Sequence, residues 1–142
     1  MRLVRIVTQS HSMDDRGNEE YDVILDDIGI HVMGATAKSM TTVKLAHPGA
    51  ATGNHYFEHQ IIFAHCLHGT IRLCVVDVEE PKHSMDQLLS AGEGAIIPAT
   101  VAYVIISATP EEHGPAMVQI FSTAFPSREY AKPYEVPLPE GN

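Results

Sequence analysis

Short apolar stretches alternate with turn-forming residues along the whole chain. The stretches are rich in Val, Ile, Thr and aromatic residues, and they span residues 2–8, 21–34, 41–46, 55–67, 70–78, 94–107 and 116–125. Gly, Pro, Asn and Asp gather between them, at residues 14–18, 47–54, 68–69, 90–94 and 109–115. Such stretches, bounded by such turns, are typical of strands. Seven strands at this spacing within 142 residues predict an all-β sandwich or barrel.

Two segments depart from this pattern. Residues 81–91, PKHSMDQLLSA, have helical character, and they predict either a helix or a loop with one helical turn. Residues 126–142 hold four of the nine prolines and predict an extended C-terminal arm. No repeat or linker interrupts the chain, so we expect a single domain over residues 1–142, with its barrel core at about 30–125.

Composition and charge exclude several classes of protein. A hydrophobic content of 44% excludes a disordered or fibrous chain. The net charge of −9 would repel phosphate backbones, so we expect no nucleic-acid partner. No apolar run approaches the roughly 20 residues that span a bilayer. The apolar stretch at the start of the chain is too short for a secretion signal. We therefore expect no membrane partner, a cytoplasmic location, and reduced, buried thiols at Cys66 and Cys74.

The segment from His55 to His59 spells H-x-x-E-H, which is a zinc-protease signature when it lies on a helix. On a strand, four residues span roughly 13 Å, too far for His55 and His59 to share one ion. A Gly-Asn turn precedes the segment and an apolar run follows it, which favours a strand. The metalloprotease interpretation is therefore rejected.

Read as strands, two regions carry glycines and polar residues at fixed spacing. They comprise Gly49, His55, Phe57, Ile62 and Gly69, and then Gly92, Pro98, Thr100, Tyr103 and Ser107. This spacing resembles the two motifs of the cupins, G-x5-H-x-H-x(3,4)-E-x6-G and G-x5-P-x-G-x2-H-x3-N. The resemblance implies an all-β double-stranded β-helix, also called a jelly-roll barrel.

The same resemblance places the metal-ligand positions of cupins at His55, Phe57, Ile62 and Tyr103. Phe57 and Ile62 cannot coordinate an ion, and a transition metal needs three or four N, O or S donors. We therefore predict no metal and no other cofactor. One alternative stays open: His59 or His65 shares strand parity with His55 and could substitute as a ligand.

An apolar barrel pocket with a few polar groups is the usual form of a small-molecule site. His55 would face this pocket as a proton-transferring base, and Tyr103 would act from the facing strand as an acid or hydrogen-bond donor. These two residues are the catalytic candidates. His65 and His68 lie at the far end of the hairpin, where we expect structural or surface roles.

Three stretches resemble the metal-free nucleotide-sugar 3,4-ketoisomerases and 3,5-epimerases that act on dTDP-4-keto-6-deoxyglucose. Residues 14–18, DDRGN, resemble a D-x-R-G element, and residues 55–69 have the spacing that follows the catalytic histidine. Residues 92–105, together with residues 125–136, resemble a later strand and the tail of these enzymes. The resemblance implies that His55 is the base and that Arg16 contacts the ligand. The remaining substrate-binding candidates are Lys44, Phe57, His59 and Arg72.

Two other functions remain alternatives. The segment HYFEH followed by CLHG, and the tail FSTAFPSREY, are similar to ectoine synthase, which implies a metal-dependent lyase, cyclase or dioxygenase. A non-catalytic cupin that binds a small ligand is the third hypothesis. In each case we expect a homodimer, with residues 2–7 and the Pro-rich tail as candidate contacts, because exposed strand edges need cover.

Overall fold

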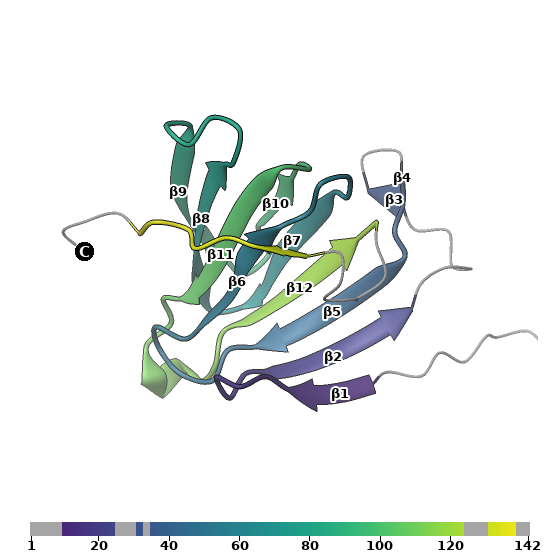
Figure 1. Cartoon of the computed structure of the whole chain (residues 1–142). Coiled ribbons are helices and arrows are strands. Elements are labelled where there is room, and N and C mark those ends of the chain that lie inside the picture. Colours follow the sequence, from purple (N-terminus) through teal and green to yellow (C-terminus); the bar gives the residue numbers. More distant parts are fainter. Residues whose placement is uncertain (1–9, 25–30, 33–34, 124–130, 139–142) are drawn as a thin grey trace, which may run out of the picture.

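The computed structural model of the chain describes residues 10–24, 31–32, 35–123 and 131–138. The apolar stretch 2–8 lies outside these residues, as do parts of the C-terminal arm. Figure 1 shows strands throughout, with a single 3-10 turn, η1 (Glu111–His113), among the described residues. Within the same residues, no helix has the length and apolar character needed to cross a lipid bilayer.

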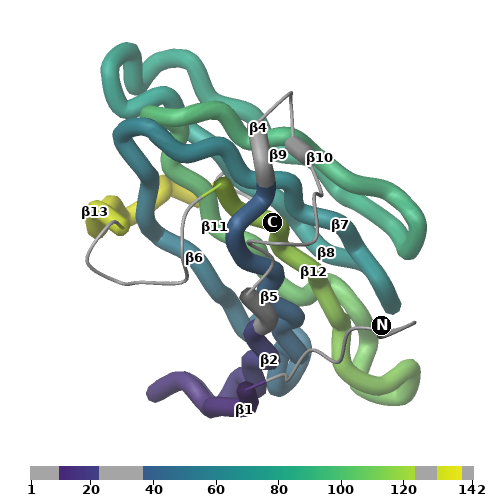
Figure 2. The backbone as a smooth tube through the Cα atoms, turned by 90° about the vertical axis from the view of Figure 1, so that its right-hand side faces the viewer, coloured from purple at the N-terminus to yellow at the C-terminus, as the bar shows by residue number. Residues whose placement is uncertain are grey.

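Two antiparallel sheets form the molecule, and both are visible in Figures 1 and 2. The first has the order β1 (Ser10–Met13), β2 (Glu19–Ile24), β5 (Ser39–Lys44), β12 (Met117–Ser122), β7 (Ile62–His68) and β10 (Gly94–Ile97). The second has the order β13 (Lys132–Pro133), β6 (Ala51–Tyr56), β11 (Val101–Ser107), β8 (Thr70–Asp77) and β9 (Ser84–Ser90). A separate small hairpin joins β3 (His31–Val32) to β4 (Ala35–Thr36). The all-β jelly-roll prediction is confirmed.

The main core lies where the two sheets face each other. Along β7 buried and less buried residues alternate, as expected when one face of a strand packs inward. β8 is buried on both faces, with Leu73 in the main core and Cys74 in an outer cluster. Both sheets contribute to the main core, whose fully buried members include Val43, Leu45, Ala64, Cys66, Ile71, Leu73, Ile105 and Val118. Cys66 and Cys74 are buried and free, which confirms the expected thiols.

The C-terminal segment packs against the outer face of the second sheet. Figure 2 shows β13 beside β6, with which it pairs. Beyond β13 the chain contributes Tyr134 and Val136 to a second apolar cluster, together with Cys74 and Val104. The described part of the predicted arm is therefore an extended segment that covers one side of this sheet.

The predicted helix or loop at residues 81–91 is wrong, because residues 84–90 form β9. This strand is the outer edge of its sheet, and every residue in it except Leu89 is exposed. A strand exposed on both faces has no alternation of apolar and polar residues, so its sequence lacks the usual strand pattern. Residues 55–67 also differ from one predicted strand, since β6 ends at Tyr56 and β7 begins at Ile62.

Thr100 has an unusual backbone conformation in the turn between β10 and β11. It lies in the left-handed region, with φ of 64°, which is rare for a β-branched residue. Its backbone N–H donates to the carbonyl of Phe57 at 2.8 Å, which ties the β10–β11 turn to the β6–β7 connection.

Candidate active site

A cavity of about 190 Å³ lies between the two sheets. Its walls come from β6 and β11 on one side, from β2, β5, β7 and β12 on the other, and from single residues of two connections. The lining residues are Glu20, Asp22, Ser39, Thr41, Val43, Thr52, His55, Phe57, Ile62, Tyr103, Ile120, Ser122 and Ala131. All four positions that correspond to cupin metal ligands therefore line one cavity.

A β-bulge sets the position of His55. Tyr103 of β11 pairs with His55 and the next residue, Val104, pairs with Gly53, so Asn54 is an extra residue in β6. Gly53 has φ of 111° and Asn54 has φ of 59°, and a Cβ on Gly53 would lie 2.6 Å from the Tyr103 carbonyl oxygen. Bulges commonly redirect a side chain beside an active site. Here the bulge places His55 directly across from Tyr103.

His55 and Tyr103 form a hydrogen-bonded pair inside the cavity. The Nε2 atom of His55 lies 2.9 Å from the Tyr103 hydroxyl oxygen. The imidazole also meets two aromatic rings edge-on, with ring centroids 5.0 Å from Tyr103 and 5.5 Å from Phe57. These contacts hold the imidazole from two sides, so the cavity contains a fixed nitrogen next to a fixed hydroxyl.

Burial makes the neutral forms of both residues more stable. Burial lowers the pKa of His55, a backbone hydrogen bond with Gly53 partly offsets this, and the Arg16 charge lowers it further. Burial, followed by the negative charge of Glu20, raises the pKa of Tyr103, whose side chain is only 3% exposed. At neutral pH an uncharged imidazole therefore faces a protonated phenol. In that state Nε2 accepts the proton of the hydroxyl when the ring proton is on Nδ1.

The wall opposite His55 is polar and acidic, which the sequence analysis missed. Glu20 and Asp22 are alternate residues of β2, and the Thr41 hydroxyl of β5 donates to Asp22 Oδ1 at 2.5 Å. Among the described residues that line the cavity there is no Lys or Arg. The E-x-D alternation in β2 was visible in the sequence, but the sheet order that brings β2 to this cavity was not.

The donor set does not fit a metal ion of the kind that cupins bind. Of the four corresponding positions, only His55 and Tyr103 carry donor atoms, and the raised pKa of Tyr103 keeps its phenol protonated. In the part of the chain that the structure describes, no three His, Cys, Asp or Glu side chains are grouped to hold an ion. A transition-metal site needs three or four donors.

His59 and His65, the alternative ligands, do not line the cavity. His59 lies in the β6–β7 connection with its side chain 85% exposed, 3.9 Å from Glu58. His65 stacks on Phe63 in β7. His68, at the end of the same strand, bonds through Nδ1 to the Pro115 carbonyl, 3.0 Å away.

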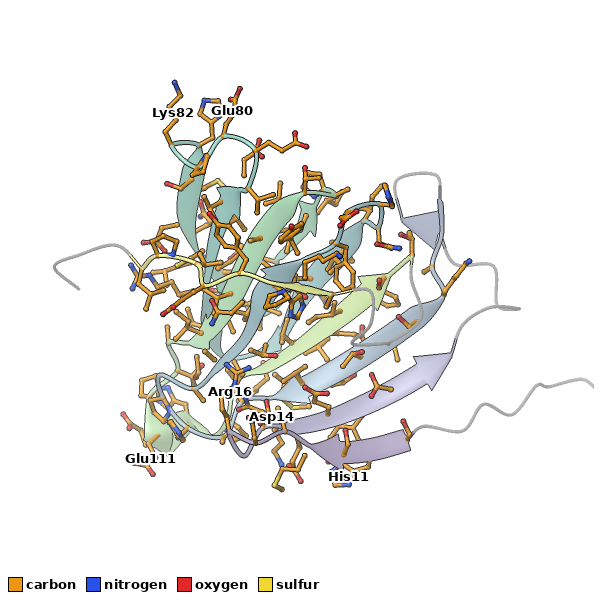
Figure 3. All side chains as sticks on the ribbon, in the orientation of Figure 1. His11, Asp14, Arg16, Glu80, Lys82 and Glu111 are labelled. Carbon is orange, nitrogen blue, oxygen red and sulfur yellow. The ribbon has the colours of Figure 1, made fainter. Side chains whose placement is uncertain are left out.

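The other predicted substrate contacts also lie outside the cavity, apart from Phe57. Arg16 is exposed in the turn before β2, at the end of the molecule opposite to Glu80 and Lys82 (Figure 3). Lys44 of β5 pairs with Glu19 at 3.4 Å. Arg72 of β8 bonds to Asp86 of β9, with both nitrogen–oxygen distances at 2.8 Å. The structure therefore brings together His55, Tyr103 and Phe57, with only the charge of Arg16 reaching His55.

The turn that carries Arg16 is tightly held by its neighbours. Asp14 Oδ1 accepts hydrogen bonds from the backbone N–H groups of Arg16 and Asn18, each at 2.9 Å. The buried Asn18 amide donates to the Ala51 carbonyl and accepts from the Ala46 N–H, both at 2.9 Å. The D-x-R-G element therefore fixes the hairpin between β1 and β2 against the start of β6.

Comparison with solved structures identifies the fold. CapF, the capsular polysaccharide assembling protein of Staphylococcus aureus, matches with a TM-score of 0.71 at 14% identity, over 91% of this chain and 33% of CapF. Oxalate decarboxylase from Bacillus subtilis matches with a TM-score of 0.65 at 17% identity, over 88% of this chain and 30% of that enzyme. Both neighbours are cupins.

The fold is the cupin fold. The chain spans about a third of the length of the solved structures it matches. No family model matches the sequence, and a search of the curated proteins finds no significant match. At 14% and 17% identity these similarities show the fold alone.

Proposed function

We propose that the protein is a metal-independent isomerase or epimerase that moves a proton at a carbon next to a carbonyl group. The observation that carries the proposal is the hydrogen-bonded pair of half-buried His55 and buried Tyr103, 2.9 Å apart, in a cavity where Phe57 and Ile62 stand at the other two ligand positions. A carbonyl group acidifies the neighbouring C–H, so one base and one hydrogen-bond donor suffice for this chemistry.

The two residues have complementary tasks in this reaction. When substrate enters, the Tyr103 hydroxyl turns from His55 Nε2 to the carbonyl oxygen, and Nε2 becomes free to accept a proton. Nε2 takes the proton from the carbon next to the carbonyl, and the C–H electron pair moves into a bond to the carbonyl carbon as its oxygen gains charge. In an epimerase a proton then returns to the same carbon from the opposite face, and the carbonyl re-forms. In an isomerase the proton goes to the former carbonyl carbon, whose oxygen becomes a hydroxyl, while the hydroxyl on the first carbon loses its proton and becomes the new carbonyl. No electron is gained or lost, so the reaction needs no redox cofactor.

The favoured substrate is a nucleotide-linked 4-keto-6-deoxy sugar, as the sequence resemblance implies. The cavity of about 190 Å³ is smaller than the roughly 300 Å³ at which pockets for drug-sized ligands begin, so it suits the sugar ring alone. The carboxylates of Glu20 and Asp22 would repel a diphosphate, which must then lie outside the cavity, where the exposed Arg16 is available to contact it. The likeness to a capsular polysaccharide assembling protein also supports a carbohydrate substrate.

The test is exchange of solvent deuterium into dTDP-4-keto-6-deoxyglucose, followed by NMR at the carbons next to the carbonyl. We expect exchange by the unmodified protein, and a loss of about 10²- to 10⁴-fold in His55→Ala, the range that general bases contribute. His59→Ala, which changes an exposed histidine, serves as the matched control and keeps the full rate. A chelator leaves the rate unchanged.

Three results would contradict the proposal. One is no exchange by the unmodified protein, and another is a His55→Ala variant as active as the His59→Ala control. The third is a rate lost with chelator and restored by a divalent metal. Binding of the sugar nucleotide without exchange, equal in both variants, would instead identify a binding protein.

A further inference from the structure

Four strands form the outer edges of the two sheets, and they differ in how well they are protected. Within the described part of the chain, β13 consists of Lys132 and Pro133 alone, and Lys and Pro on an edge strand discourage pairing with another chain. The edges β1 and β10 have four residues each. The edge strand β9 has seven, with no Pro and no Lys, and its one charged residue, Asp86, is already paired with Arg72. Its length and composition make β9 the least protected edge.

The surface at this edge is also apolar. Met85 and Leu88 of β9 are 53% and 58% exposed, and Ile96 of the nearby β10 is 49% exposed. A groove of about 500 Å³ runs between β8, β9 and β10, with Val75, Met85 and Ile96 among its walls. Long, apolar, unprotected edges attract another strand, so natural proteins usually cover them.

The hydrogen bonds of β9 show which of its backbone groups point outward. Asp77 N–H donates to the His83 carbonyl at one end of the β8–β9 ladder, and Ala91 N–H donates to the Gly69 carbonyl at the other. In an antiparallel ladder bonded residues alternate, so Met85, Gln87 and Leu89 bond to β8. The residues between them direct their N–H and C=O groups away from β8; they are Ser84, Asp86, Leu88 and Ser90.

We propose that β9 pairs with β9 of a second copy of this chain, in antiparallel fashion, about a two-fold axis at Gln87. Full overlap of the seven residues places Asp86 opposite Leu88 of the partner subunit and Ser84 opposite Ser90 of the partner subunit. Each of these pairs exchanges two backbone hydrogen bonds between residues whose N–H and C=O groups point outward. The two five-stranded sheets become one continuous sheet across the axis.

Charge and packing favour this register. No like charges stand opposite each other, whereas an axis at Asp86 would oppose two carboxylates, which is destabilising. The partner's Leu89 comes beside Met85, so an exposed apolar side chain gains an apolar neighbour. A second copy therefore provides hydrogen-bond partners for the outward backbone groups of β9 and apolar neighbours for its side chains. This interface is a different one from the candidate contacts at residues 2–7 and the Pro-rich tail.

Sedimentation velocity at tens of micromolar protein tests the interface. The unmodified chain is expected as a dimer. Leu88→Glu places a carboxylate directly opposite Asp86 of the partner subunit, twice in each dimer, and weakens it by at least about tenfold. Met13→Glu is the matched control, since Met13 is 63% exposed on β1, an edge strand of the other sheet. Circular dichroism checks that both variants are folded. A monomeric unmodified chain overturns the proposal, and so does dissociation caused by Met13→Glu but not by Leu88→Glu.

A cross-link tests the register. At the axis the two Gln87 residues form a non-hydrogen-bonded pair, whose Cα atoms lie about 4.5 Å apart, within the range that a disulfide spans. Gln87→Cys is expected to give a covalent dimer on oxidation, because the native thiols of Cys66 and Cys74 are buried. Leu67→Cys, 39% exposed on β7, is the control that stays monomeric on a non-reducing gel. A dimer in which Gln87→Cys does not cross-link overturns the proposed register.

Discussion

Two cross-strand pairs in the second sheet have similar donor–acceptor distances but differ in how far they are buried. His55 of β6 and Tyr103 of β11 are 2.9 Å apart on the inner face, where the cavity lies. Arg72 of β8 and Asp86 of β9 are 2.8 Å apart on the outer face. Tyr103 is 3% exposed, whereas the side chains of the other pair are 19% and 35% exposed.

Burial decides what each pair can do. On the inner face the charged forms are disfavoured, so the pair is neutral and its shared proton can be passed to and from a ligand. On the outer face water stabilises both charges, and the pair only links two strands. A polar pair becomes a candidate for chemistry because of its surroundings more than because of its residue types.

The largest expected change comes from restoring the missing donors to the inner face. Phe57→His with Ile62→Glu would complete a set of four donors with His55 and Tyr103 at the positions where cupins bind metal. We expect the variant to hold about one equivalent of a divalent transition metal, by elemental analysis after dialysis against Zn²⁺ or Mn²⁺. Phe57→Leu with Ile62→Leu changes the same side chains without adding donors, and it should stay metal-free; equal metal content in the two variants would show that the cavity is not the site.

Next in size is the effect of the bulge that aims His55. Gly53→Ala combines a strained φ with a Cβ 2.6 Å from a backbone oxygen, so we expect a loss of more than about 2 kcal/mol in the free energy of unfolding. Gly92→Ala has a similar φ, 93°, but meets no atom within 4 Å, and should lose only about 1 kcal/mol. Urea denaturation measures both, and equal losses would mean that the contact with Tyr103 does not matter.

Removing one hydroxyl from the inner pair should have a smaller effect. Tyr103→Phe leaves His55 Nε2 without its partner, which is expected to cost about 1–3 kcal/mol of unfolding free energy. Tyr134→Phe, in the half-buried outer cluster, is the comparison, and should change stability by less than about 0.5 kcal/mol. If the two substitutions cost the same, the buried hydrogen bond does not stabilise the fold.

The lowered pKa of His55 predicts a dependence of stability on pH. The unfolded chain binds a proton at this residue near pH 6.5, whereas the folded chain binds it only at lower pH. The stability linked to His55 is therefore fully present above about pH 6.5 and is lost as the pH falls toward the folded-state pKa. Urea midpoints between pH 7.5 and pH 5 should fall less steeply in His55→Gln than in His59→Gln, and parallel curves would contradict the shift.

The smallest effect is expected on the outer face. Arg72→Gln removes an ion pair that water already screens, so the urea midpoint should remain within error of the unmodified protein at moderate salt. A clear loss of stability, absent at high salt, would show that the outer pair matters more than its exposure indicates.

Most of the fold follows from sequence pattern, and its exceptions have physical reasons. Strands rich in β-branched and aromatic residues, such as β8 and β12, can be recognised from that composition. In the edge strand β9 only Leu89 is buried, so its sequence has no strand pattern and the prediction of a helix or loop there is wrong. The turn expected at residues 47–54 was half strand, because the Gly-Asn pair that resembled a turn forms the bulge in β6.

Only the site residues that belong to the two motifs could be predicted from the sequence. Spacing placed His55, Phe57 and Tyr103, and all three line the cavity. Glu20 and Asp22 line the same cavity from a strand far away in the sequence, and only the order of the sheet brings them there. Lys44 and Arg72 looked like candidate cations, but each has an acidic partner on a neighbouring strand.

Asn54, the extra residue of the bulge, joins the C-terminal segment to the cavity. Its backbone carbonyl accepts from Tyr134 N–H and its side-chain oxygen accepts from Val136 N–H, each at 3.0 Å. The residue that follows it is His55. Shortening the chain before Tyr134, or fusing a tag that pulls on this segment, would therefore disturb the imidazole from behind, although no residue of the cavity had been replaced.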